Sequence, residues 1–246
     1  MVRGMFAGAP ITPRTHAMVG QVIRVQEWLG SLAKLDDARD YQAVLCGERS
    51  LFEATLDIVL LASDPTAAER MIEWEESAKL KQAKLAMEYV ARMGGPVDDN
   101  HGWAVRVRME EDIKRKRQSR GWEKHPERWT GPRRTLGQDA VAGDRLQQRF
   151  GFEHWYETRY RFVCWTVHGS GLVLRMVDPV DRPAFVARSL NFSADLAQEA
   201  ARSTVEGMGW SGPLSASLNL MLACATSNFF FASSRGKRGH VSTKAI

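Results

Sequence analysis

The sequence predicts an all-α fold, an irregular bundle of about six to eight helices. Apolar residues recur at helical spacing along most of the chain, and runs that alternate as a strand does are few. The aromatic total is modest, with only 4 Tyr, which argues against an all-β fold. With 246 residues, 44% of them apolar and 26% charged, the chain is long enough for one large helical domain with extensions.

The N-terminal half contains three expected helices. Residues 18–35 and 36–62 carry apolar side chains three and four positions apart. Ser63-Asp64-Pro65 ends the second helix and begins the third, because Ser or Asp caps a helix and Pro suits its first turn. The third helix, residues 66–92, is long and charged, and Gly94-Gly95-Pro96 ends it. A further helical stretch is expected to reach about residue 117.

The C-terminal half contains a central helix among shorter elements. We expect helices over residues 136–145, 153–170 and 193–206, with a proline-containing loop at 178–183 between the last two. From Gly207 to Ser234 the chain has no charged residue. A membrane span needs about 20 mostly apolar residues, and Ser, Asn, Gly and Pro dilute this stretch. A buried helix over 214–232 is therefore favoured, and membrane association is not expected.

The ends of the chain differ from its middle in composition. We expect residues 1–17 to form a flexible leader, residues 18–232 a single helical domain, and residues 233–246 a disordered basic tail. The three cysteines are odd in number and far apart, so a reducing, cytoplasmic setting is expected. The histidines lack metal-ligand spacing and no phosphate-binding glycine motif occurs, so neither a metal nor a cofactor is expected.

A basic segment, residues 113–134, separates the two helical halves. It holds nine Lys and Arg against two acids, a local excess of +7 in a chain whose net charge is +5. Lys and Arg neutralise phosphates and Trp stacks on unpaired bases, which would suit single-stranded RNA. The alternative is a solvated loop whose Trp side chains fill the core. The candidate nucleic-acid-binding residues are Lys114, Arg115, Lys116, Arg117, Arg120, Trp122, Lys124, Arg128, Trp129, Arg133 and Arg134.

The central helix carries a polar stripe. Residues 157, 161, 164 and 168 follow one another at steps of four, three and four, which places them on one face. Arg161 and His168 then lie about two turns apart, roughly 10 Å along the axis, and Arg161 is long enough to reach towards the imidazole. The stripe offers a permanent cation beside a group that exchanges protons near neutral pH. The alternative is a structural His, with Arg161 paired to Glu157 one turn back.

Several short motifs together resemble a bacterial family of helical proteins that carries only a domain-of-unknown-function label. They are Arg49-Ser-Leu-Phe-Glu53, Arg128-Trp129-Thr130-Gly131, Tyr156 and Tyr160, and His168-Gly169-Ser170. The resemblance spans roughly residues 40 to 230. It adds Arg49, Glu53, Tyr160 and Ser170, together with Glu157 of the stripe, as supporting site residues. A salt bridge between Arg49 and Glu53 that fixes helix packing is the alternative for that pair.

The central helix also resembles the HEPN superfamily, whose metal-independent ribonucleases and toxin or antiphage proteins carry an Arg-x4-6-His signature. Here it reads Arg161 to His168, at the longest permitted spacing, and Phe162 stands where HEPN nucleases usually have a polar residue. The resemblance implies an HEPN-like fold, a catalytic Arg161 and His168, RNA as substrate, a homodimer and a partner protein encoded nearby. The competing hypothesis is a non-catalytic helical binding or regulatory module.

Overall fold

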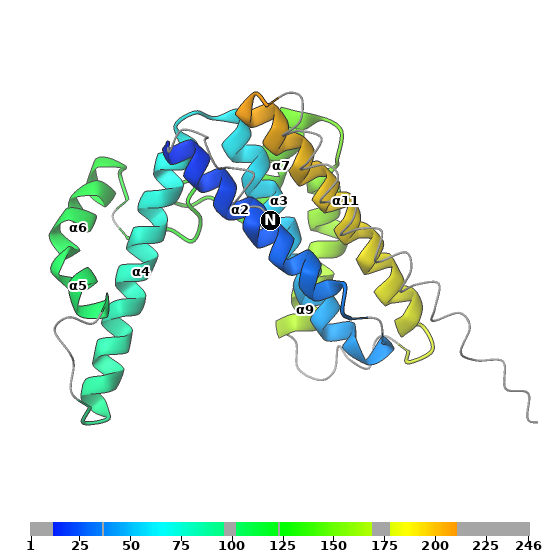
Figure 1. The fold of residues 1–246 in the computed structure, drawn as a ribbon, viewed down its shortest axis with the longest axis horizontal. Coiled ribbons are helices and arrows are strands. Elements are labelled where there is room, and N and C mark those ends of the chain that lie inside the picture. Colours follow the sequence, from blue (N-terminus) through cyan, green and yellow to red (C-terminus); the bar gives the residue numbers. More distant parts are fainter. Residues whose placement is uncertain (1–11, 36, 96–101, 123, 169–177, 211–246) are drawn as a thin grey trace, which may run out of the picture. The chain divides into compact units, whose positions relative to one another are not determined.

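A computed structural model describes residues 12–35, 37–95, 102–122, 124–168 and 178–210 (Figure 1). These residues form helices joined by turns, with no strand among them, and the predicted all-α fold is confirmed. The expected helix 214–232, the tail 233–246 and Ser170 lie outside the described residues. So do residues 1–11 of the expected leader, whereas the first described helix already begins at Pro13.

The chain divides into two compact units. Unit 1 combines residues 1–64 with residues 140–246, and unit 2 comprises residues 65–139. Unit 1 contains α2 (Pro13–Leu32), a short 3-10 turn (Ala38–Asp40), α3 (Tyr41–Ser63), most of α7 (Leu136–Gln147), α8 (Phe152–Trp155), a π turn (Tyr156–Tyr160), α9 (Arg161–His168) and α11 (Arg182–Met208). Unit 2 contains α4 (Ala67–Arg92), α5 (Gly102–Arg108) and α6 (Glu110–Ser119).

The central element of unit 1 is α3, which packs against α2, α9 and α11 (Figure 1). Fifteen of its 23 residues are buried, so it is apolar on most of its circumference. The two helices α3 and α11 are also joined by a buried hydrogen bond, in which the Thr55 hydroxyl donates to the carbonyl of Leu196 at 3.2 Å. The burial of apolar side chains such as those of α3 is the main source of stability in a helical bundle.

Helices α3 and α11 approach closely where Gly207 faces Ala62. A Cβ on Gly207 would lie 2.6 Å from the Ala62 Cβ and 2.8 Å from its Cα, which is part of the backbone and cannot turn aside. Interiors are packed densely enough that an added methyl group at such a point moves the helices apart. Gly207 therefore sets the distance between the two longest helices of unit 1.

We predict that Gly207→Ala destabilises the protein by about 1–3 kcal/mol through overpacking. The matched control is Gly20→Ala in α2, where nothing lies within 4 Å of the added Cβ. That change should stabilise the protein by about 0.5–1 kcal/mol, because Ala loses less conformational freedom than Gly in a helix. Urea unfolding followed by circular dichroism measures both, and equal behaviour of the two variants would contradict the close approach.

Candidate functional site

A π turn precedes α9 and determines which side chains face α3. The N–H of Arg161 donates to the carbonyl of Tyr156, five residues back, where an α-helix would use four. The extra residue in this turn changes the angular position of every side chain that follows it. In consequence Arg159 and Tyr160 turn towards α3, and Arg161 turns towards solvent.

Four polar side chains from α3, the π turn and α9 form a cluster, here called the Arg49 cluster: Arg49, Glu53, Tyr160 and His168. The Nε of Arg49 donates to Glu53 Oε1 at 3.1 Å and to the Tyr160 hydroxyl at 3.2 Å. Tyr160 in turn donates to Glu53 Oε1 at 2.6 Å. The guanidinium is thus held on one side, and its Nη1 is directed at His168 Nε2, to which it is hydrogen-bonded.

Burial governs the chemistry of Tyr160. It raises the pKa of the phenol well above its ordinary value, and the neighbouring Glu53 carboxylate raises it further. Tyr160 therefore keeps its proton across the physiological range and acts as a fixed hydrogen-bond donor. Burial likewise raises the pKa of the adjacent Cys164 thiol, against the opposing effect of its hydrogen bond with Tyr160. Neither group is prepared to act as a nucleophile.

The contact between Arg49 and His168 is open to solvent. His168 is exposed at the C-terminal end of α9, and the Arg49 side chain is 28% exposed. Because a guanidinium only donates hydrogen bonds, Nε2 of His168 accepts here, and the ring carries its proton on Nδ1. A cation and an unprotonated imidazole nitrogen therefore meet at the surface, which is the combination needed to bind a phosphate and remove a nearby proton.

Arg161 lies elsewhere. Its Nη1 donates to Glu157 Oε2 at 2.8 Å, and more than half of each side chain is exposed. The pair with Glu157 is the alternative that the sequence left open for Arg161. The expected approach of Arg161 to the imidazole is not found among the contacts of the described residues. Within the described residues the cation at His168 is Arg49, which sequence reasoning had placed among the supporting residues.

Sequence reasoning missed a second polar cluster entirely. Arg159 binds Glu48 through two bonds, one of them from Nη2 to Oε2 at 2.8 Å, and Nη2 also donates to Ser189 Oγ at 2.7 Å. Glu48 is only 2% exposed, and its burial raises its pKa while the Arg159 guanidinium opposes that rise. This cluster ties α3, the π turn and α11 together, which gives it a structural role.

The basic segment is less basic in three dimensions than in sequence. Arg120 pairs with Glu73 and Glu69 of α4, and Lys116 pairs with Glu76. Lys114 and Arg115 bind acids of their own helix, and Arg117 has a partner as well. These acids lie outside residues 113–134, so the local excess of +7 is largely compensated. Among the candidates, Lys124 and Arg133 show no carboxylate partner within the described residues.

The two tryptophans of the basic segment face inwards. Trp122 and Trp129 are each 2% exposed, so neither ring is available for stacking on a base. This is the alternative in which they fill the core of the loop. The first seven residues of the segment belong to α6, and the irregular part begins at Arg120.

Asp139 holds the irregular part of the segment together. Its carboxylate is fully buried and accepts from Arg128 Nε at 2.8 Å, Thr130 Oγ1 at 2.9 Å and Arg134 Nε at 3.1 Å. The motif Arg128-Trp129-Thr130-Gly131 is therefore a structural loop built around one carboxylate. Arg128 and Arg134 both pair with Asp139, so their positive charge is largely neutralised and contributes little to nucleic-acid binding.

The described residues contain no group of three or more His, Cys, Asp and Glu side chains placed to hold a metal ion. Among the same residues no helix has both the length and the apolar character needed to cross a membrane.

Comparison with known proteins identifies the family. The family model of a family of unknown function, DUF5677, matches residues 34–181, more than half of the chain, and the chain belongs to this family. The match includes the Arg49 cluster, Glu48 and Arg159 of the second cluster, and the basic segment, and it ends at Asp181, directly before α11. No curated protein and no solved structure matches the chain.

We predict that Arg159 and Arg161, two residues apart, differ sharply in their effect on stability. Arg159→Ala leaves Glu48 buried without its counter-charge and should cost about 3–5 kcal/mol. Arg161→Ala removes an exposed pair and should leave the free energy of unfolding unchanged within error. Chemical denaturation of both variants tests this. A large loss for Arg161→Ala would mean that the π turn is not formed.

We further predict that Asp139→Ala destabilises unit 2 by about 3–5 kcal/mol, because the largely buried Arg128 loses its bond to this carboxylate. Asp112→Ala serves as the control, since Asp112 pairs with Arg115 where both side chains are mostly exposed. Limited proteolysis around residues 128–134 should show cleavage only in the Asp139 variant. Protection of this loop in that variant would contradict its dependence on the carboxylate.

Proposed function

We propose that the chain is a metal-independent RNA-cleaving protein whose catalytic pair is Arg49 and His168. The observation that supports this most directly is the solvent-facing hydrogen bond between the two side chains, with Glu53 and Tyr160 holding the arginine from behind. An HEPN-like toxin or antiphage role in the cytoplasm is part of the same proposal. Arg49 then takes the catalytic role that the signature gives to Arg161.

The chemistry follows from the two groups. A phosphodiester entering the cluster draws the Arg49 guanidinium onto its non-bridging oxygens, and this frees Nε2 of His168. Nε2 then accepts the proton of the 2′-hydroxyl as that oxygen attacks phosphorus, and Arg49 stabilises the charge that builds up on the phosphorane. The bond to the 5′-oxygen breaks, which leaves a 2′,3′-cyclic phosphate and a 5′-hydroxyl.

The leaving oxygen needs a proton from a second donor. An in-line displacement places the attacking and leaving oxygens on opposite sides of phosphorus, so one imidazole does not serve both. A homodimer that brings two Arg49 clusters to one phosphate would supply this proton from the second His168, protonated on both ring nitrogens. The homodimer is therefore the assembly that this mechanism favours.

A second candidate is a non-catalytic binding or regulatory module. It is favoured by the number of partners that Arg49 has: Glu53, Tyr160 and His168 all bond to it, as in a cluster that only fixes helix packing. The compensation of the basic segment by acids of α4 and α7 also favours it, because little positive charge is left there for RNA.

Purified protein incubated with single-stranded RNA in the presence of EDTA decides between the two. We predict that the wild type cleaves, that His168→Ala and Arg49→Ala each lose about 10²–10⁴-fold in rate, and that Arg161→Ala retains activity. Circular dichroism establishes that the variants are folded, and growth of expressing cells provides a parallel measurement.

Three outcomes would contradict the proposal. Cleavage by His168→Ala at the wild-type rate would remove the imidazole from the mechanism. An inactive wild type whose His168 and Arg49 variants also lose their fold would assign the cluster to packing, as in the second candidate. Loss of activity in Arg161→Ala with Arg49→Ala unaffected would restore Arg161 as the catalytic arginine.

A further inference from the structure

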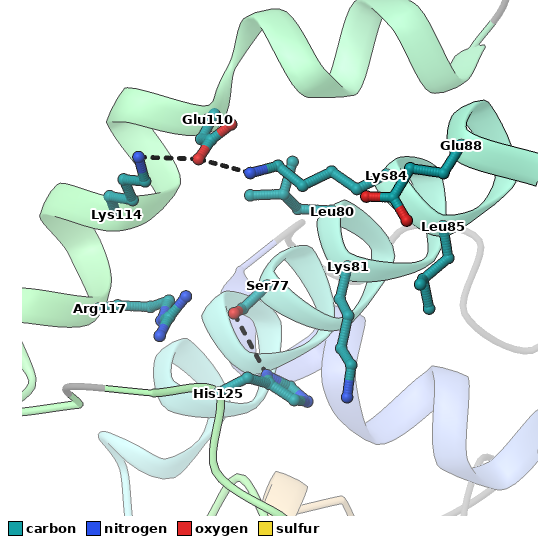
Figure 2. A pocket seen from close by; sticks show the side chains of 10 residues that line it. All are labelled: Ser77, Leu80, Lys81, Lys84, Leu85, Glu88, Glu110, Lys114, Arg117 and His125. Carbon is teal, nitrogen blue, oxygen red and sulfur yellow. Dashed lines mark hydrogen bonds and ion pairs between the residues drawn. The ribbon is translucent and has the colours of Figure 1, made fainter. Parts of the chain in front are cut away.

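Unit 2 contains a cavity of about 350 Å³ between α4, α6 and the loop that follows α6. Figure 2 shows the side chains that line it, which come from three separate stretches of unit 2. The volume lies at the lower end of the range for small-molecule sites, about 300–1,000 Å³. It is distinct from the Arg49 cluster, which lies in unit 1.

On one wall of the cavity the charged groups are paired with one another. Glu110 Oε1 receives Lys84 Nζ at 2.6 Å and Lys114 Nζ at 2.8 Å, one from each side (Figure 2). The hydrogen bonds from Lys114 and Lys84 lower the pKa of Glu110 to about 2. The carboxylate is thus always charged at neutral pH and keeps both lysines occupied.

The opposite wall is positive. Lys81 and His125 lie side by side there, with Arg117 facing them (Figure 2). Within the described residues no carboxylate pairs with Lys81. Burial lowers the pKa of His125, and the nearby charges of Lys81 and Arg117 lower it further. An anion bound at this wall would be attracted by these charges.

The positive wall is also ordered. The His125 ring stacks on Trp74, with 5.4 Å between the ring centroids, and its Nδ1 is 3.2 Å from the hydroxyl of Ser77, which is 2% exposed. Trp74 itself donates to the carbonyl of Pro126 at 2.8 Å, which fixes the loop that carries His125. The imidazole is therefore held in position before any ligand arrives, and little entropy is lost on binding.

Beside these polar groups the cavity has an apolar surface. Leu80 is nearly buried, whereas Leu85 is 56% exposed and offers hydrocarbon to an occupant. A ligand that fits both surfaces has an anionic end and an apolar body. The Lys81 ammonium and the His125 imidazole can bond to separate oxygens of one phosphate, which accepts bonds on three oxygens.

We propose that this cavity is a binding site for a small organic phosphomonoester, whose phosphate contacts Lys81 and His125 and whose apolar part lies against Leu80 and Leu85. The proposal goes beyond RNA cleavage and does not depend on it. A polymer is the less suitable ligand, because most other cations of α6 and the following loop are already paired with carboxylates.

Isothermal titration calorimetry of the full chain tests the site with phenyl phosphate as the probe. Inorganic phosphate lacks the apolar part and benzyl alcohol lacks the charge, so both should bind more weakly than phenyl phosphate. Lys81→Gln should weaken phenyl phosphate binding by about tenfold, the effect of one charge-assisted hydrogen bond. Lys79→Gln is the control, since Lys79 is exposed on the same helix, pairs with Glu75 and does not line the cavity.

Three results would overturn the proposal. The first is the absence of saturable heat with phenyl phosphate at millimolar concentration. The second is equal affinity of the wild type and Lys81→Gln, with both folded by circular dichroism. The third is binding of a single-stranded RNA that depends on Lys81 while phenyl phosphate does not bind, which would assign the wall to a polymer. None of these measurements involves RNA cleavage, so the result is independent of the activity of the Arg49 cluster.

Discussion

The structure of unit 1 depends on a conflict within α3, which is buried along most of its length and yet carries charged residues. An ion buried without a partner costs several kcal/mol. Glu48 meets this requirement through Arg159, and Arg49 through Glu53, Tyr160 and His168. Three of these four partners, Arg159, Tyr160 and His168, come from the π turn and α9. The position of this segment against α3 is therefore fixed by polar pairing as much as by apolar contact.

The π turn is the means by which both clusters form at once. Arg159 and Tyr160 are adjacent in sequence, and each bonds to a different carboxylate of α3, Glu48 and Glu53, five residues apart on that helix. Beside them the Phe52 ring packs on the rings of Tyr160 and Phe152. The result is a rigid support behind His168, whose own side chain stays accessible. Such a division between a fixed interior and an open edge is what a catalytic pair requires.

Sequence patterns predicted the helices well and the site only in part. The expected helices at 66–92 and 136–145 closely match α4 and α7. Residues 182–192 were expected to lie outside a helix because Pro183 suggested a loop, yet a proline is accepted in the first turn, and α11 begins at Arg182. The polar stripe identified His168, but its partner Arg49 lies 119 residues away in the sequence. Helical periodicity relates only residues of the same helix, so it does not predict this contact. Extrapolating a regular helix through residues 156–160 favoured Arg161 and overlooked Arg159.

The division of the chain into two units also constrains the order in which the protein folds during translation. Unit 1 is assembled from two stretches of sequence, and the hydroxyl of Thr55 bonds to a carbonyl 141 residues further along. During translation α2 and α3 leave the ribosome long before α11, so the apolar surface of α3 stays uncovered while unit 2 is synthesised. Unit 2 is continuous in sequence and can close first. The nascent chain therefore has a period in which the part of α3 that α11 later covers is exposed.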